Sequence, residues 1–161
     1  MPILHTQFAG QVTSRQGEIV PLAPNVALQN RGPVIQVTVS LAAAFAQGLQ
    51  QGGHAVPAPI AGWALVDTGA SDTCIDADQA QRMGLPAIDV VTMASASHAA
   101  TLQNLYPIRI EFASVPIVVD APRVMGANLA AQSLLLLIGR DLLQHCTFTY
   151  NGLAGCITFC V

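Results

Sequence analysis

Charge is scarce in this chain of 161 residues, and lysine is absent altogether. Charged residues make up 9% of the sequence, and the six basic ones are arginines scattered without a cluster. Aromatic residues are also few, at 5%. A nucleic-acid-binding surface needs clustered cations, often with aromatic side chains between them, so we expect no nucleic-acid partner.

Long hydrophobic runs are missing too, although hydrophobic residues make up 52% of the chain. The most apolar stretch, residues 129–138, is broken by Gln132 and Ser133 and is too short to span a bilayer. The first residues lack the charged segment and apolar core of a signal peptide. We therefore expect a cytoplasmic protein with no membrane partner. A chain that is so apolar and has so little charge exposes apolar surface unless a partner covers part of it. This composition therefore favours an oligomer.

Cysteine is limited to four residues, too few for a disulfide framework in a chain of this length. His145 with Cys146, Cys156 and Cys160 is a conceivable zinc set, but no pair has the Cys-x2-Cys spacing of a zinc knuckle. We predict buried thiols on strands, with no metal and no cofactor. A zinc hydrolase would need a ligand spacing that this sequence does not contain.

Turn residues and β-branched segments predict one β-rich domain over residues 1–161. The residues before 30 are expected to form N-terminal strands, and residues 41–59 an insertion containing a helix. The expected strands are 8–12, 18–22, 33–39, 60–66, 90–94, 104–112, 115–119 and 134–138. Short helices are expected at 76–83, where Asp76 is a suitable N-cap, and at 139–143. Residues 122–132 are expected to be a loop or a short helix.

The end of the chain contains Asn151-Gly152, which favours a two-residue hairpin turn. That turn places Cys146 opposite Ile157 and puts Cys146, Phe148, Tyr150, Leu153 and Ile157 on one face. A longer loop would place Cys146 opposite Cys160. The tight turn gives the more uniform apolar face, so we predict no Cys146–Cys160 disulfide.

One strand is expected to lead directly into Asp67-Thr68-Gly69-Ala70-Ser71. The buried strand would fix the backbone, and Gly69 would let the chain turn closely behind the Asp67 carboxylate and point an N–H at it. Thr68 offers a hydroxyl that can lock the loop. Taken alone, this segment is also compatible with an ordinary Asx-turn after a strand.

A second motif follows later in the chain, Leu136-Leu137-Ile138-Gly139-Arg140-Asp141. The order of strand, Asp-Thr-Gly-Ala, a hairpin region, Ile-Gly-Arg-Asp and a short helix resembles the retroviral-type (retropepsin-like) aspartic proteases, over about residues 34–150. The resemblance implies an all-β retropepsin-like acid protease barrel with one or two short helices plus an inserted helix, active as a homodimer.

The resemblance also implies a mechanism. Asp67 from each of two subunits would activate a water that hydrolyses peptide bonds, as in an aspartic endopeptidase acting on peptide or protein substrates. Ala70 after the glycine is typical of the retroviral type, and the chain has one Asp-Thr-Gly, so the second aspartate would come from a second copy. In the family, the hydroxyl at Thr68 bonds across to the partner loop. The alternative is a catalytically inactive dimeric peptide-binding module of the same fold.

The family pattern assigns supporting roles as well. Thr68, Gly69, Ala70 and Ser71 would support the active-site loop, and Ile138, Gly139, Arg140 and Asp141 would be structural residues near the site. Viral members often have an aspartate where this chain has Ser71, and it pairs with the arginine. Arg140 therefore needs another partner. We expect its guanidinium to bind carboxylate or backbone oxygens near the base of the Asp67 loop, with Asp72 and Asp141 as candidate carboxylates. A solvated arginine is the alternative.

The flap over the site is expected at residues 93–98, where viral flaps are rich in glycine and this chain has none. Its candidate substrate contacts are Met93, Ala94, Ser95, Ala96, Ser97 and His98. For His98 the alternative is a solvated loop histidine. In viral relatives the chain ends form a sheet between subunits, so we expect the closing hairpin, residues 146–161, to form much of the interface.

Overall fold

The computed structural model describes residues 2–95, 98–113 and 115–160, and it is mostly β-structure. The strands are β1 Ile3–Gln7, β2 Gly10–Thr13, β3 Ile19–Leu22, β4 Val34–Leu41, β5 Ile60–Val66, β6 Cys74–Asp76, β7 Asp89–Ser95, β8 His98–Phe112, β9 Val118–Ala127, β10 Leu136–Ile138, β11 Thr147–Asn151 and β12 Cys156–Cys160. The helices are α1 Pro24–Arg31, α2 Ala43–Gln51, α3 Ala77–Arg82 and α4 Arg140–Leu143, with a 3-10 turn at Ala130–Gln132. The all-β class with short helices is confirmed.

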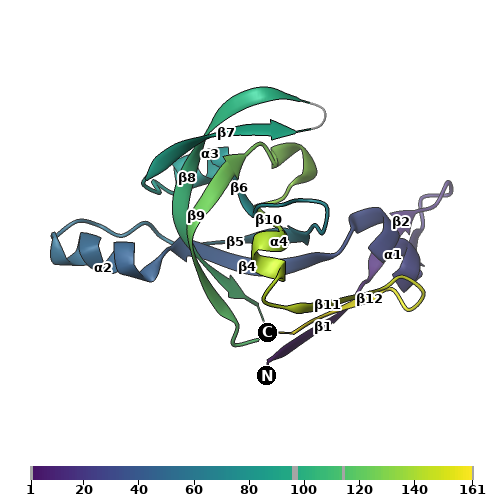
Figure 1. Cartoon of the computed structure of the whole chain (residues 1–161). Helices are drawn as coiled ribbons and strands as arrows, with labels where there is room; N and C mark the ends of the chain where they lie inside the picture. The colour runs from purple at the N-terminus through teal and green to yellow at the C-terminus, as the bar shows by residue number, and fades with distance from the viewer. Residues whose placement is uncertain (1, 96–97, 114, 161) are drawn as a thin grey trace.

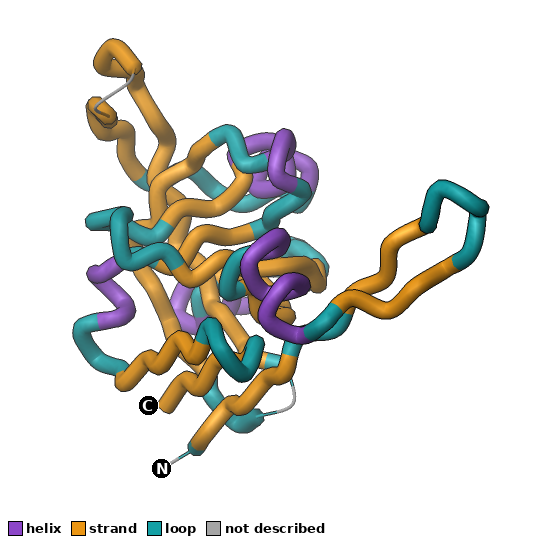
Figure 2. The backbone as a smooth tube through the Cα atoms, turned by 90° about the vertical axis from the view of Figure 1, so that its right-hand side faces the viewer, coloured by secondary structure: helices purple, strands orange, loops and turns teal. Residues whose placement is uncertain are grey.

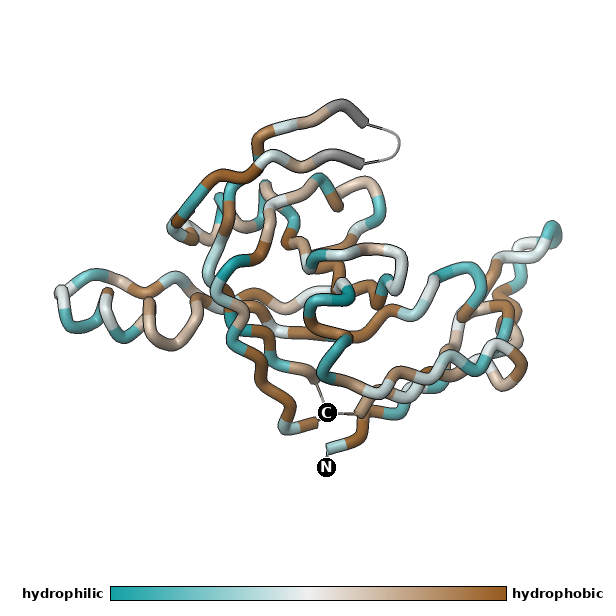
Figure 3. Tube along the Cα trace, viewed as in Figure 1, coloured by the Kyte–Doolittle hydropathy of each residue, from teal (hydrophilic) through white to brown (hydrophobic). Residues whose placement is uncertain are grey.

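A closed barrel forms the body of the molecule (Figure 1). Its strands follow the order β4-β5-β10-β6-β9-β8, and antiparallel pairing of β4 with β8 closes it. Strand β7 adds to β8 beyond the barrel, and the two form a hairpin above it. Alternating residues of β4 and β8, such as Val37, Val39, Ile108 and Ile110, are almost fully buried in the core. Figure 3 shows hydrophobic residues recurring along these strands.

The short strand β10 brings the two motifs of the sequence together. It runs parallel to β5 and antiparallel to β6, and its register places Ile138 opposite Val66. Leu136 and Ile138 are completely buried. The prediction that Asp67 lies beside Ile138 and Gly139 is therefore confirmed.

The ends of the chain form a separate sheet in the order β1-β12-β11. The prediction of N-terminal strands is right for β1 and for the hairpin β2–β3, which projects from the body (Figure 2), although no separate strand was expected at Ile3–Gln7. It is wrong over Pro24–Arg31, which form helix α1. Pro24 lies in the first helical turn, where proline is favourable, and Gly32, at φ 74°, ends the helix. Ala27 and Leu28 of this helix are buried.

The register predicted for the closing hairpin is wrong. Asn151 pairs with Cys156, so four residues form the turn, and Tyr150 lies opposite Ile157. A two-residue type I′ turn needs positive φ at Asn151 and Gly152, but the positive φ falls at Gly155, at 66°. The Asn151 side chain instead accepts a hydrogen bond from the Ala154 N–H at 3.0 Å.

This register also rearranges the faces of the hairpin. Leu153 is 93% exposed and does not join the apolar face, and Cys160 lies opposite Thr147 rather than Cys146. All four cysteines are free, which confirms that Cys146 and Cys160 are not bonded.

Strand β9 is longer than predicted and continues through Pro122, in a region expected to be a loop or a short helix. Its pairing with β8 shifts between Tyr106 and Ile108, where Pro107 lies opposite two residues of β9. A bulge of this kind tolerates proline because the missing N–H lies where the ladder is already interrupted.

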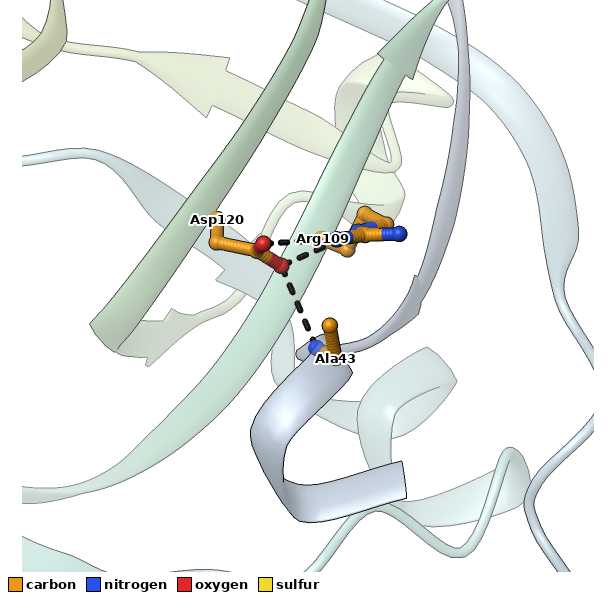
Figure 4. A network of polar contacts seen from close by, with 3 residues as sticks. All are labelled: Ala43, Arg109 and Asp120. Carbon is orange, nitrogen blue, oxygen red and sulfur yellow. Dashed lines mark hydrogen bonds and ion pairs between the residues drawn. The ribbon is translucent and has the colours of Figure 1, made fainter. Parts of the chain in front are cut away.

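Helix α2 joins β4 to β5 and extends away from the barrel, with no buried residue. Its first turn is anchored by a carboxylate from the barrel, as Figure 4 shows. Asp120 on β9 accepts a hydrogen bond from the Ala43 N–H at 3.2 Å and two from Arg109 on β8, at 3.0 and 2.7 Å. The bonds from Arg109 hold the pKa of Asp120 below its usual value. The base of the predicted insertion is thus tied to the barrel.

In the ranges given above, no helix is both long and apolar enough to cross a membrane. Across the same residues, no three His, Cys, Asp or Glu side chains lie together in a group that could hold a metal ion.

Candidate active site

The Asp67 loop begins where β5 leaves the barrel. The Val66 N–H donates to the Pro33 carbonyl and the Asp67 N–H to the Ile138 carbonyl, both at 3.0 Å. The Asp67 side chain is partly exposed, and its Oδ1 accepts a hydrogen bond from the Gly69 N–H at 2.8 Å. The backbone therefore fixes both the position of Asp67 and the orientation of its carboxylate. The predicted N–H of Gly69 is confirmed.

Gly69 lies close to the carboxylate that its N–H binds. A Cβ atom at Gly69 would lie 3.0 Å from Asp67 Oδ1, closer than ordinary contact. Thr68 and Gly69 are exposed at the tip of the loop. The role of the Thr68 hydroxyl toward a second subunit stays a prediction.

Arg140 holds the Asp67 loop through two backbone oxygens and one hydroxyl. Its Nη1 donates to the carbonyls of Thr68 and Gly69 at 2.9 and 3.1 Å, and its Nη2 donates to Ser71 Oγ at 2.8 Å. The prediction that this guanidinium binds oxygens at the base of the Asp67 loop is confirmed. The candidate carboxylates, Asp72 and Asp141, are not its partners, because its donors bind Ser71 Oγ and two backbone oxygens.

Helix α4 holds the same loop through its backbone. The Arg140 N–H donates to the Ala70 carbonyl at 3.0 Å, and the Asp141 N–H donates to the Ser71 carbonyl at 3.1 Å. The structure thus places Ala70 and Ser71 directly against the start of α4, as the two-motif pattern predicts.

The sequence analysis missed a residue of this support, Thr73, which is 1% exposed. Its hydroxyl donates to Asp141 Oδ1 at 2.7 Å and accepts from the Gly139 N–H at 3.1 Å. Asp141 is therefore bound to Thr73 rather than to Arg140. A single hydroxyl gives no periodic pattern in the sequence. Its contacts with Asp141 and Gly139 can be recognised only in the folded chain, where β6 pairs with β10.

Asp76 does more than cap α3. Its Oδ1 accepts from the Gln79 N–H at 3.0 Å, which confirms the predicted N-cap. Its Oδ2 accepts from the Leu129 N–H, also at 3.0 Å. The carboxylate is 3% exposed, so it joins α3 to the loop after β9 in the interior of the protein.

We expect Arg140→Lys to lower the free energy of unfolding by about 1–2 kcal/mol, because lysine cannot form the three bonds of the guanidinium fork. Chemical denaturation measures the change. Arg82→Lys is the matched control, since Arg82 is exposed in the last turn of α3. If both variants unfold at the wild-type midpoint, Arg140 does not support the loop.

A cavity of about 610 Å³ lies between the Asp67 loop and the β7–β8 hairpin. Residues 69–72 form one side, and Met93, Thr101 and Gln103 of the hairpin form another. Met93, predicted in the flap, therefore faces the site. Ala96 and Ser97 lie outside the described residues, and the structure describes Ala94, Ser95 and His98 by their backbone only. Substrate contacts by these five residues stay predictions.

Cys74 also lines this cavity, but its thiol is suited to packing rather than to catalysis. Burial, with smaller effects from Asp72 and Asp141, raises the pKa of its thiol to about 11. The thiol is therefore protonated at neutral pH and is a poor nucleophile. The carboxylate of Asp67, which the Gly69 N–H orients in the adjoining loop, is the better candidate for chemistry.

Comparison with known proteins agrees with this site. The family model described as aspartyl protease matches residues 52–142, more than half of the chain and including both motifs. The chain belongs to the aspartyl protease family.

Two solved structures are similar to this chain. One is a retropepsin-like aspartic protease from Rickettsia conorii, 16% identical, covering 94% of this chain and 90% of that one with a TM-score of 0.41. The other is the retroviral protease-like domain of Ddi1 from Leishmania major, 15% identical, covering 73% and 81% with a TM-score of 0.40. A search of curated proteins gave no match.

Proposed function

We propose that the protein is an aspartic endopeptidase that works as a homodimer, with Asp67 of each subunit at one shared site. The observation that carries this proposal is the Asp67 carboxylate itself, oriented by the Gly69 N–H in a loop whose next residues, 69–72, line a cavity. Each chain has one such loop, and the chemistry needs two carboxylates. A two-fold axis between two copies of Asp67 would supply the second.

The proposed chemistry follows from placing two carboxylates a few ångströms apart. Both cannot ionise comfortably at that distance, so the pair shares a proton. The ionised member acts as the general base for a water, and the protonated member polarises the carbonyl of the scissile bond. Gly69 binds Oδ1, and we propose that Oδ2 faces the water.

The terminal sheet supports the proposed dimer. Its central strand, β12, is paired on both sides, so β1 and β11 are its edges. Ile3 on β1 is 54% exposed, and Tyr150 on β11 is 48% exposed. Exposed edges with apolar side chains favour pairing with another strand, and a second copy would cover them. The proposed interface is therefore an edge of this sheet rather than the closing hairpin alone.

The lining of the cavity suggests the kind of substrate. Met93, Met125, Leu129 and Leu137 contribute apolar surface, while Thr101 and Gln103 add polar groups on the hairpin side. An extended peptide with apolar side chains fits such a lining, because apolar walls give affinity and a few polar groups fix orientation.

A second candidate function is a dimeric peptide-binding module without activity. The hairpin without glycine favours it, because its tip differs from that of active viral enzymes. Cleavage of a generic protein substrate at acid and neutral pH separates the two functions. Cleavage that is blocked by a peptide-like inhibitor with a tetrahedral hydroxyl supports the enzyme, and binding without cleavage supports the module.

Dilution tests the shared site. We expect the specific activity to fall as the protein is diluted through its dimer dissociation constant, since a monomer has half of the catalytic pair. The measurement is the initial rate per mole of chain, with light scattering at the same concentrations. A constant specific activity in samples that are monomeric by mass would overturn the homodimer.

A further inference from the structure

A second cavity, of about 480 Å³, lies against β5, the strand that leads into Asp67. Its walls include Arg31, Trp63, Leu65 and Leu134. No acidic residue lines it within the described part of the chain, so its one charged lining residue is a cation. Such a cavity is suited to a ligand that combines an apolar part with a negative charge.

Strand β5 connects this cavity to Asp67. Side chains alternate along a strand, and Ala64 and Val66 are buried in the core. Trp63 and Leu65 are partly exposed and lie on the other face, in line with Asp67, which directly follows the strand. At about 3.3 Å per residue, Trp63 lies about 13 Å from Asp67 along the strand. That distance equals about four residues of an extended peptide.

Arg31 is held over Trp63, with its guanidinium carbon 4.1 Å from the ring centroid. This cation–π contact holds the guanidinium beside the cavity, and a guanidinium held over a ring can still donate N–H groups to a carboxylate. Other arginines have different functions: Arg109 and Arg123 form ion pairs with Asp120 and Asp89, and Arg140 holds the Asp67 loop.

The position of Arg31 relative to the site is fixed by the backbone. Arg31 ends α1, and two residues later the Pro33 carbonyl accepts the hydrogen bond from the Val66 N–H. The Arg31 backbone is therefore tied to the residue that precedes Asp67. A peptide that extends from the Asp67 loop along β5 would reach this guanidinium, because it lies over Trp63 of that strand.

We propose that Arg31, stacked on Trp63, binds a carboxylate of the substrate peptide three or four residues from the scissile bond. The protein would then select extended segments that combine apolar residues near the cleaved bond with an aspartate or glutamate further along. A guanidinium fork recognises a carboxylate through two parallel hydrogen bonds, which gives geometric selectivity. The inference rests on the proposed function, because it places the carboxylate relative to a scissile bond.

A matched peptide library tests the inference. Each cleavable peptide carries glutamate or glutamine at one position, scanned on both sides of the scissile bond, and kcat/KM is measured for wild type and Arg31→Gln. We expect wild type to prefer glutamate over glutamine by about five- to ten-fold at three or four residues from the bond. Arg31→Gln should remove that preference, so that its kcat/KM values on the glutamate and glutamine peptides become equal. Arg31→Lys should keep part of it, and Arg82→Gln, at an exposed arginine on α3, should keep all of it.

Equal preference for the two peptides in wild type, or a preference unchanged by Arg31→Gln, would overturn the inference. An equal loss of kcat/KM on every peptide in Arg31→Gln, together with a weaker dimer by light scattering, would also overturn it. Arg31 would then be a cation of the subunit interface. If wild type cleaves no peptide at all, the proposed function fails instead. Fluorescence anisotropy of the same peptides then tests Arg31 directly, and equal affinity for glutamate and glutamine peptides would overturn the carboxylate site as well.

Discussion

Replacing Asp67 by asparagine should abolish peptide cleavage while leaving the fold and the dimer intact. The amide nearly matches the carboxylate in shape, and its oxygen can still accept the hydrogen bond that the Gly69 N–H gives to Oδ1. It cannot act as a general base, so we expect kcat/KM to fall by at least about 10²- to 10⁴-fold. The measurement is cleavage of one peptide, together with thermal unfolding and sizing of the same samples.

Asp78→Asn is the matched control for that change. Asp78 is an exposed carboxylate in the first turn of α3, so the same chemical substitution is made away from the proposed site. The control should retain the wild-type rate. An Asp67→Asn protein with the wild-type rate would show that Asp67 is not the catalytic residue, and one that fails to fold would indicate a structural carboxylate.

Replacing Gly139 by alanine should cause the largest loss of stability of any single methyl addition near the site. A Cβ atom there would lie 2.5 Å from the Asp72 carbonyl carbon, 2.6 Å from its oxygen and 2.9 Å from the Thr73 nitrogen. These are backbone atoms, so the clash can be relieved only by moving the Asp67 loop away from α4. We expect the free energy of unfolding to fall by about 3 kcal/mol or more, with loss of activity.

Gly48→Ala provides a control of opposite sign. Gly48 lies inside α2, and a Cβ atom there has nothing within 4 Å. Alanine should therefore stabilise the protein by about 0.5–1 kcal/mol, because it lowers the entropy of the unfolded chain. Urea denaturation of both variants measures the two effects. If Gly139→Ala unfolds at the wild-type midpoint, the close packing of Gly139 against Asp72 is not required.

The parts of the site that the sequence predicts are those carried by local pattern. The hydrophobic runs before Asp67 and before Gly139 predict two strands. The pairing of these strands follows from the resemblance. The N-cap at Asp76 is equally local, because Gln79 lies three residues further on. Short-range chemistry of this kind is readable without knowledge of the partner elements.

The parts that the sequence does not predict depend on long-range packing. The closing hairpin contains Asn151-Gly152, yet its register is set by the turn that ends at Gly155. A Cβ atom at Gly155 would lie 2.1 Å from the Pro24 carbonyl carbon, so α1 packs directly on this turn. Since α1 itself was not predicted, neither was its effect on the hairpin. The partners of Arg140 likewise depend on how closely α4 approaches the Asp67 loop.

A tethered dimer tests the shared site most directly. Two copies of the chain are joined by a flexible linker, and Asp67→Asn is introduced into neither copy, one copy or both. One carboxylate cannot serve as base and acid together, so the protein with a single asparagine should be nearly as inactive as the one with two. The unmodified tethered dimer should retain activity on dilution. Full activity, or half of it, in the protein with a single asparagine would contradict the shared Asp67 site.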